Sequence, residues 1–381
     1  MFRKIKGFII GVAVIFAGII IVCIILTFAS RLKSNVLFDY KETANSSEKT
    51  KALPIDTFYA PLPDINSEKV VEHVLQDNQI IVNGTICSKN QGYASVLEQN
   101  PEAIRLVDEK GNYIVVERVE QNGGYSDIGI IKYDSNGRRL KKQIYGGSDF
   151  DWCNAAKYNS KIGIVISGIS QSKDGSFSNN GPSPFVACID PETLAIKWIS
   201  PVHIANDVYY VSDEAVYIVR NEDEKYNGKN ELKLSIIKLD ADGNKIWSTG
   251  PLSQWINGIT ELKDGRVIVN QKFKEDQILK KSGAINCYSK EGEKLLTFDA
   301  DCYGEIEATN DGGFIITSVR NIKTIPQPIY ISSIWYDTET VVTKYDKNYK
   351  IEWRKTYDRF KDARELDKVV PLSDGSVVLE D

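Results

Sequence analysis

The stretch IIKLDADGNKIW, residues 236–247, contains an apolar strand, a turn of Asp, Gly and Asn, and the start of a second strand. This order of residue types is typical of a β-hairpin. Related stretches are IIKYDSNGRRL at 130–140, VACIDPETLAIKW at 186–198, INCYSKEGEKLL at 285–296 and VTKYDKNYKIEW at 342–353. The chain therefore repeats one hairpin, with turns that begin at Asp134, Asp190, Asp240, Ser289 and Asp346.

A second hairpin type alternates with the first. It reads ITELKDGRVIVN at 259–270, IEATNDGGFIIT at 306–317 and VVPLSDGSVVLE at 369–380. Two hairpins in each period of roughly 50 residues make four strands, and four-stranded units repeated radially are the blades of a β-propeller. We therefore expect an all-β fold, a β-propeller of four-stranded blades.

The segment DADGN also resembles the start of a calcium-binding loop. Such a loop needs carboxylates at alternate positions and a distal Glu ligand. The equivalent turns read DSNGR, DPETL, SKEGE and DKNYK, and they lack the second carboxylate. We therefore interpret Asp242 as a turn residue that supplies a positive φ or a backbone hydrogen bond, and predict no metal site.

The phrase D-x-x-G-x-x-x-W, formed by Asp240, Gly243 and Trp247, resembles the motif of PQQ-like propeller repeats. Asp346 and Trp353 match it with Tyr349 in place of Gly, and Asp190 and Trp198 match it with Thr193 and one insertion. The DGGFII phrases also resemble the extracellular repeat propellers of bacterial surface proteins. These resemblances cover roughly residues 67–381.

In PQQ-like repeats the Trp packs between neighbouring blades, so the resemblance implies the same role here. Leu140 and Leu296 take the place of Trp in two units, as expected for a packing role in which one apolar group replaces another. The resemblance concerns architecture alone. It gives no support for binding of the quinone, and we predict no cofactor.

Two blade numbers fit the repeat. Full units begin near residues 102, 154, 204, 257 and 304, and a single hairpin follows at 367–381. A lone hairpin would expose its edges. We therefore expect the N-terminal strands to complete the last blade, which gives six blades. The alternative is seven blades, with 68–99 as a degenerate blade.

The N-terminal segment predicts a membrane anchor. Residues 7–30 carry no charge, and a helix of that length spans a hydrocarbon core of about 30 Å. A cleaved signal peptide is the alternative, with Thr27-Phe28-Ala29 as a weak cleavage site. We expect a short cytoplasmic tail at 1–6, one transmembrane helix at 7–30, a flexible extracellular linker at 31–66 and the propeller at 67–381. This single-pass topology places the C-terminal domain outside the cytoplasm.

Charge and composition exclude several classes of function. Three of the 47 Lys and Arg residues precede the anchor, so the remainder carries 44 against all 52 Asp and Glu residues, a net charge of −8. This acidity argues against a nucleic-acid partner. The two histidines, His73 and His203, stand outside any zinc or G-x-S-x-G motif, and the scattered cysteines show no disulfide framework.

The loop at 321–339, NIKTIPQPIYISSIWYDTE, is the best candidate for contact with a partner, through Tyr330, Trp335 and Tyr336. Alternatively, it covers its own blade edge. We expect a non-catalytic domain that binds or scaffolds a protein or cell-envelope partner. One alternative is an envelope hydrolase or lyase with carboxylates near the propeller channel, from acidic loops such as 146–152, 221–230 and 298–305. Another is an assembly factor like the PQQ-like propeller proteins that help insert envelope proteins.

Overall fold

The computed structural model describes residues 62–380, apart from 77–78, 83–84, 89–101, 122–123, 178–182, 201–206, 222–232, 253–254, 273–282, 301–303, 326–334 and 359–367. All of these lie in one compact unit, Phe58–Asp381. The predicted anchor at 7–30 and His203 fall outside the described residues. No helix among the described residues is long and apolar enough to cross a bilayer.

Five sheets of four antiparallel strands follow one another along the described part of the chain. The first two consist of β4 (Ile104–Val107), β5 (Tyr113–Glu120), β6 (Ser126–Tyr133) and β7 (Arg139–Tyr145), then β8 (Asp151–Asn159), β9 (Gly163–Ser170), β10 (Ser183–Ile189) and β11 (Ile196–Ile199). The third and fourth consist of β12 (Asp207–Val211), β13 (Ala215–Asn221), β14 (Leu234–Asp240) and β15 (Lys245–Ser248), then β16 (Ile256–Glu261), β17 (Val267–Lys272), β18 (Gly283–Tyr288) and β19 (Lys294–Ala300).

The fifth sheet consists of β20 (Glu305–Ala308), β21 (Phe314–Ile325), β22 (Trp335–Tyr345) and β23 (Ile351–Asp358). A sixth sheet joins the two ends of the unit: β24 (Lys368–Pro371) pairs with β25 (Val377–Glu380), and β1 (Glu72–Val74) pairs in parallel with β25. An N-terminal strand thus enters the last sheet, as the lone terminal hairpin predicted. A 3₁₀ turn, η1 (Ser67–Lys69), leads into β1.

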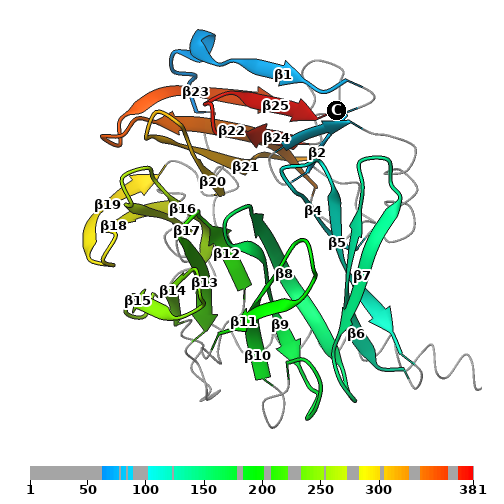
Figure 1. Cartoon of the computed structure of the whole chain (residues 1–381). Coiled ribbons are helices and arrows are strands. Elements are labelled where there is room, and N and C mark those ends of the chain that lie inside the picture. Colours follow the sequence, from blue (N-terminus) through cyan, green and yellow to red (C-terminus); the bar gives the residue numbers. More distant parts are fainter. Residues whose placement is uncertain are drawn as a thin grey trace, which may run out of the picture. The chain divides into compact units, whose positions relative to one another are not determined.

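The sheets are arranged as propeller blades. The first strands of successive sheets contact one another, β8 with β4 and β12, and β16 with β12 and β20. Figure 1 shows β12 and β16 near the middle of the unit, and β15 and β19 toward its outside. Each hydrophobic cluster combines buried side chains from successive sheets. The all-β fold is confirmed, and the arrangement is consistent with six blades.

Two parts of the expected organisation need correction. The hairpin β2 (Gln79–Val82) and β3 (Thr85–Ser88) forms a two-stranded sheet of its own, so of the N-terminal strands β1 alone completes the last sheet. Residues 62–66, expected within the flexible linker, lie along β23. Ile65 forms a bridge with Arg354 there, and Asp64 accepts a hydrogen bond from the Thr356 amide.

The hairpin turns at Asp134, Asp240 and Asp346 share one hydrogen-bonding scheme. Asp240 Oδ1 accepts from the backbone amides of Asp242 and Asn244 at 2.9 and 2.8 Å, and Gly243 supplies the positive φ of +82°. Asp134 and Asp346 accept from the equivalent amides two and four residues further on. The hairpin interpretation is confirmed, with a correction: the carboxylate and the positive φ come from Asp240 and Gly243, and Asp242 contributes its amide.

Tryptophans connect neighbouring blades. Trp198 Nε1 donates to Ala241 O at 2.7 Å, in the next blade's turn, and Trp247 Nε1 donates to Lys290 O at 2.8 Å, in the turn after that. Each indole also lies against a turn glycine, because a Cβ added at Gly243 would stand 2.6 Å from the Trp198 ring. Trp therefore does pack between blades at these two junctions.

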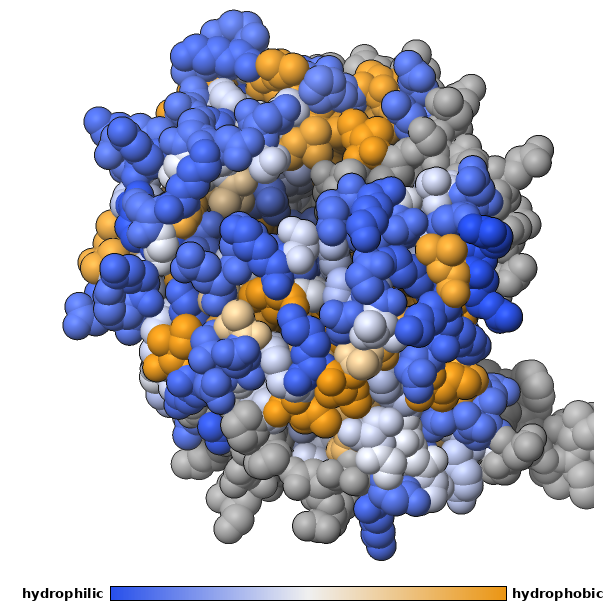
Figure 2. All heavy atoms as spheres, viewed as in Figure 1, coloured by the Kyte–Doolittle hydropathy of each residue, from blue (hydrophilic) through white to orange (hydrophobic). Residues whose placement is uncertain are grey.

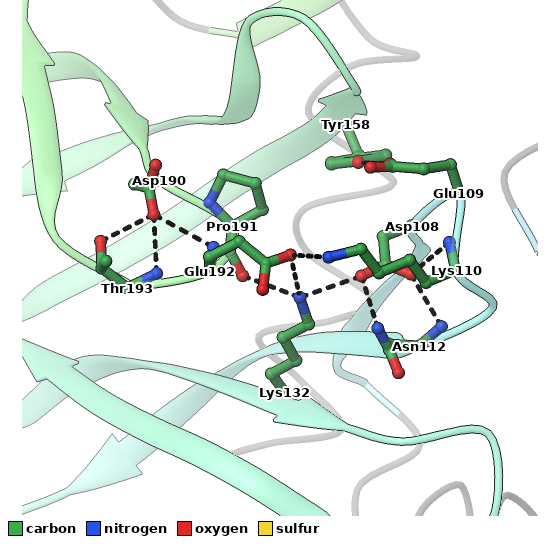
Figure 3. A network of polar contacts seen from close by, with 10 residues as sticks. All are labelled: Asp108, Glu109, Lys110, Asn112, Lys132, Tyr158, Asp190, Pro191, Glu192 and Thr193. Carbon is green, nitrogen blue, oxygen red and sulfur yellow. Dashed lines mark hydrogen bonds and ion pairs between the residues drawn. The ribbon is translucent and has the colours of Figure 1, made fainter.

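The first junction departs from the sequence expectation. Lys141, not Leu140, holds the Trp position, because Lys141 pairs with Lys132 as Trp247 pairs with Lys238. The prediction for Leu140 was wrong by one residue. The donor is instead Lys132, whose Nζ reaches Pro191 O at 3.0 Å, as Figure 3 shows.

The junction at Leu296 uses another substitute. Leu296 does hold the Trp position, since it pairs with Cys287. The hydrogen bond comes from Arg266, whose Nη2 reaches Lys347 O at 3.1 Å while its guanidinium lies over the Tyr349 ring. At each of these four junctions, the backbone carbonyl of the second turn residue accepts a hydrogen bond from a side chain of the preceding blade. This shared geometry is the seam that holds adjacent blades in register.

Candidate functional site

A cavity of about 690 Å³ opens where the first strands of the sheets converge. Its lining comes from β2, β8, β12, β16, β20 and β24 and the residues after β24: Ile81, Ala155, Lys157, Asp207 to Tyr210, Asn257 to Ile259, Glu305 to Glu307, and Val370 to Ser373. In a propeller these strands surround the central channel. The cavity is therefore the candidate functional site.

The lining is acidic. Among the described residues that line the cavity, the cation is Lys157, and the carboxylates are Asp207, Glu305 and Glu307. Glu305 and Glu307 are two residues apart on β20, so the pleat of the strand directs both side chains to one face. Ile306 between them points to the opposite face and is buried in a hydrophobic cluster. Because side chains alternate along β20, Glu305 and Glu307 face the channel and Ile306 packs in the core.

Burial raises the pKa of Glu307 from its ordinary 4.5 to about 7, with a further contribution from the negative charge of Glu305, while Lys157 opposes the shift. Burial also raises the pKa of Asp207. The pKa of Tyr210 rises to about 12, through burial and then the charge of Glu307. Near neutral pH, the Glu307 carboxyl can therefore be present in both protonation states.

Aromatic side chains complete the cavity wall on β12. Tyr209 and Tyr210 are half-buried, and Tyr209 Oη donates to Ile256 O of the neighbouring sheet at 3.1 Å. On the adjoining strand, Gly258 lies so close to β20 that a Cβ there would be 2.6 Å from Ile306. The wall is thus fixed by packing and hydrogen bonds between blades, and the carboxylates are held on strands.

This arrangement can bind a cationic or hydrogen-bonding group. Three carboxylates line the cavity, with Asp207 and Glu307 partly buried and Glu305 exposed, and together they attract positive charge. A group of three or more His, Cys, Asp or Glu placed to hold a metal ion is absent from the part of the chain that the structure describes. Cys153, Cys188 and Cys287 are free thiols.

The predicted partner residues lie elsewhere. Tyr330 falls outside the described residues. Trp335 and Tyr336 are strand residues at the start of β22, paired with Ile325 and Thr324 of β21. The prediction of a loop over 321–339 is therefore wrong at both its ends, which extend the hairpin. Contact with a partner there stays a prediction.

The three acidic loops proposed from the sequence differ in where the structure places them. Asp151 of the 146–152 segment is fully buried at the start of β8, where it accepts hydrogen bonds from the Gly147 amide and the Ser172 hydroxyl, and it does not line the cavity. In the 221–230 loop, only residue 221 is among the described residues. The 298–305 segment contributes Glu305 to the cavity. Sequence reasoning missed Asp207 and Glu307, although a carboxylate within the first strand of a repeat was a usable signal.

The face seen in Figure 2 is mostly hydrophilic, with hydrophobic side chains in small separate groups. Among the residues coloured there, no broad continuous apolar surface stands out. Recognition by large apolar contact is therefore not favoured on this face.

Comparison with known proteins finds no family and only distant structural similarity. No family model matches the chain, and no curated protein matches it. Similar solved structures include the Dos1 propeller (9% identity, 78% of this chain and 81% of that chain, TM-score 0.38). A eukaryotic initiation factor is 9% identical, with 74% of this chain and 62% of that chain covered and a TM-score of 0.38. The Kuenenia stuttgartiensis hydrazine synthase is 9% identical, with 65% of this chain and 64% of that chain covered and a TM-score of 0.40. The chain thus spans less than two thirds of these last two chains.

Proposed function

We propose that this protein is a membrane-anchored, extracytoplasmic binding domain that recognises its partner through the acidic central cavity. The observation that carries the proposal is the lining of Asp207, Glu305 and Glu307 against Lys157. The partner is a protein or cell-envelope polymer that presents an amine or another cationic group. Residues 7–30 supply the anchor, and the role is non-catalytic.

The charge balance supports a cationic partner. Carboxylates held in a concave, low-dielectric site attract positive charge more strongly than the same groups in water. Two of the carboxylates, Asp207 and Glu307, have raised pKa values because burial disfavours their charge. A bound cation reverses that penalty, so binding and deprotonation of these groups favour each other.

Titration of the full-length protein with hexalysine and with glucosamine oligomers tests this proposal. We expect binding at low salt that weakens as salt rises, and no binding of N-acetylated oligomers. Asp207→Asn combined with Glu305→Gln should weaken binding at least tenfold. Asp213→Asn is the matched control, because Asp213 is 54% exposed on the turn after β12, outside the cavity lining. Equal binding by both variants would contradict a role for the cavity.

One observation favours a second function, an envelope hydrolase or lyase. A carboxyl group with a pKa of about 7, as in Glu307, can act as a general acid near neutral pH while a neighbouring carboxylate stays charged. Turnover of cell-envelope glycans that Glu307→Gln abolishes, with a bell-shaped pH profile, would support this function. Unchanged turnover in Glu307→Gln would exclude Glu307 as the acid.

The blade junctions support the finer proposal of a PQQ-like propeller. The indoles of Trp198 and Trp247 dock on the next blade's turn, which is the role that the repeat motif implies. An envelope assembly factor of this type would hold a stable membrane partner. Crosslinking in intact cells, followed by purification of the full-length protein, tests this: recovery of the protein alone would count against it.

A further inference from the structure

Two buried carboxylates lie at the junction between the first two blades. Asp127 is the second residue of β6, and Asp151 is the first residue of β8. The rings of Tyr125 and Phe150, which stand just before these acids in the chain, pack edge to face with their centroids 5.3 Å apart. Strands β6 and β8 also contact each other. The two acidic residues are therefore brought together from different blades.

The segment Gly146-Gly147 lies between the two carboxylates. A Cβ added at Gly146 would stand 2.0 Å from Asp127 Oδ1, so this oxygen lies against the glycine. The Gly147 amide donates to Asp151 Oδ2 at 2.9 Å. Burial raises the pKa of Asp127, a hydrogen bond from Gln121 opposes the shift, and the charge of Asp151 adds to it. Each carboxylate is thus within reach of the charge of the other.

Three oxygens at this junction have no hydrogen-bond partner among the described residues: Asp127 Oδ1, Asp151 Oδ1 and Ser170 Oγ. Their residues are 8%, 0% and 1% exposed, so bulk water does not serve them. Ser170 is the direct partner of Asp151 in the β8–β9 pair, and both side chains therefore project from the same face of the sheet. The second oxygen of each carboxylate is already bonded, Asp127 Oδ2 to Gln121 Nε2 at 2.7 Å and Asp151 Oδ2 to two donors.

The charge at this junction is not balanced by the chain. Neither Asp127 nor Asp151 forms an ion pair within the part of the chain that the structure describes. A buried carboxylate is costly unless it is paired or binds a metal ion, and two such groups close together also repel each other. A proton shared by the pair would remove one charge and satisfy two of the three oxygens. A cation would compensate both charges and could contact all three.

We propose that Asp127, Asp151 and Ser170 bind one calcium ion at the junction of the first and second blades. All three donors are oxygens, which are the ligands that Ca²⁺ takes, in a flexible geometry. Mg²⁺ usually keeps several waters, for which such deeply buried atoms leave little room. Because the described residues place fewer than three acidic side chains here, backbone or water oxygens complete the coordination. The ion joins β6 to β8 and β9, and none of its ligands lines the central cavity.

Calorimetric titration of full-length protein in detergent, freed of metal with EDTA, tests this site with CaCl₂ alone. We expect one ion per chain with a Kd of about 0.1–1 mM, and at least tenfold weaker binding of Mg²⁺. Asp127→Asn keeps an acceptor for Gln121 and removes a charged ligand, so it should weaken Ca²⁺ binding at least tenfold. Asp174→Asn is the matched control, because Asp174 is an exposed acid nearby whose Oδ1 already accepts from the Ser148 amide.

A second control separates this site from the central cavity. The double variant Asp207→Asn with Glu305→Gln removes two cavity carboxylates and should leave Ca²⁺ binding unchanged. The failure of cationic ligands to bind the central cavity would likewise leave this site untouched, since the two share no residue. If the double variant loses Ca²⁺ as Asp127→Asn does, the ion lies in the cavity and the proposal is refuted.

Thermal unfolding gives a readout that a merely structural role would not produce. Calcium at a hundredfold excess over Kd should raise the melting temperature of the wild type by about 4–8 °C and leave Asp127→Asn unchanged. Without calcium, Asp127→Asn should melt at or above the wild type, because it removes one of two buried like charges. The proposal is overturned if the wild type does not bind Ca²⁺, if Asp127→Asn binds it equally well, or if Mg²⁺ binds as tightly. A stabilised Asp127→Asn beside a wild type that ignores Ca²⁺ would assign a shared proton instead.

Discussion

Replacement of Lys132 by Met should destabilise the propeller more than any exposed charge change at the same junction. The side chains of Lys132 and Asp108 are 4% and 2% exposed, and their charged atoms are 3.0 Å apart. Met fills a similar space but leaves the Asp108 carboxylate without its cation. Removing one partner of a buried ion pair costs about 3–5 kcal/mol of the free energy of unfolding.

The contacts of the site set the magnitude within that range. Asn112 still donates to Asp108 from its amide and from Nδ2, both at 2.8 Å, which reduces the cost. Loss of the hydrogen bond to Pro191 O adds about 1 kcal/mol, and loss of the pair with Glu192, which is 57% exposed, adds less than about 1 kcal/mol. We expect a total of about 3–4 kcal/mol.

Urea unfolding followed by circular dichroism measures this loss. Lys110→Met is the matched control, since Lys110 contacts the same Glu192 but is 60% exposed, and it should cost under about 1 kcal/mol. Similar small losses in both variants would refute the reasoning from burial.

The pH dependence of the difference adds a check. Burial alone would raise the pKa of Asp108, but hydrogen bonds from Asn112 and Lys132 outweigh it and lower that pKa. The stability from Asp108 is therefore present above its unfolded pKa of about 3.9 and is lost as pH falls through the folded pKa. The difference between wild type and Lys132→Met should shrink in strong acid, and a pH-independent difference would contradict the ion-pair explanation.

Three further predictions follow from the contacts above. Burial raises the pKa of Glu307 from 4.5 to about 7, so the stability from its protonated form is complete below pH 4.5 and is lost as pH rises to 7. Glu307→Gln should remove this pH dependence. In urea unfolding at pH 8, the variant should be more stable than the wild type by about 1–3 kcal/mol. Gly243→Ala combines a φ of +82° with a clash against Trp198 and should lower the free energy of unfolding by about 2–4 kcal/mol, whereas Gly111→Ala, with open space around it, should cost about 1 kcal/mol. Arg266→Leu should cost about 1–3 kcal/mol by calorimetry, and Leu296→Trp in the same chain should recover part of it by donating to Lys347 O; no recovery would show that the two donors are not interchangeable.

The blades could be predicted because their signals are local. A hairpin needs a turn residue with a positive φ or a capping carboxylate between two alternating strands, and both are readable in residues 240–243 and their repeats. The Leu140 error shows the limit of this reading. A shift of one residue moves a side chain to the other face of the strand, and only the pairing of Lys132 with Lys141 fixed the register.

The central site was mostly hidden because it is non-local. Its carboxylates come from strands about 100 residues apart in the chain, Asp207 on β12 and the pair Glu305 and Glu307 on β20. Each looks alone like an ordinary strand residue. The burial of Asp207 and Glu307, and the raised pKa of Glu307 that follows from it, exist only once the blades have closed around the channel.

The sequence by itself determined the all-β class, the four-stranded repeat and the turn residues, because hairpins are built from contacts between near neighbours in the chain. The tertiary structure alone decided which donor crosses each seam, which carboxylates share the channel, and that β1 pairs with β25. These features join residues from different blades, and their energies depend on burial and distances that only the closed arrangement of blades creates.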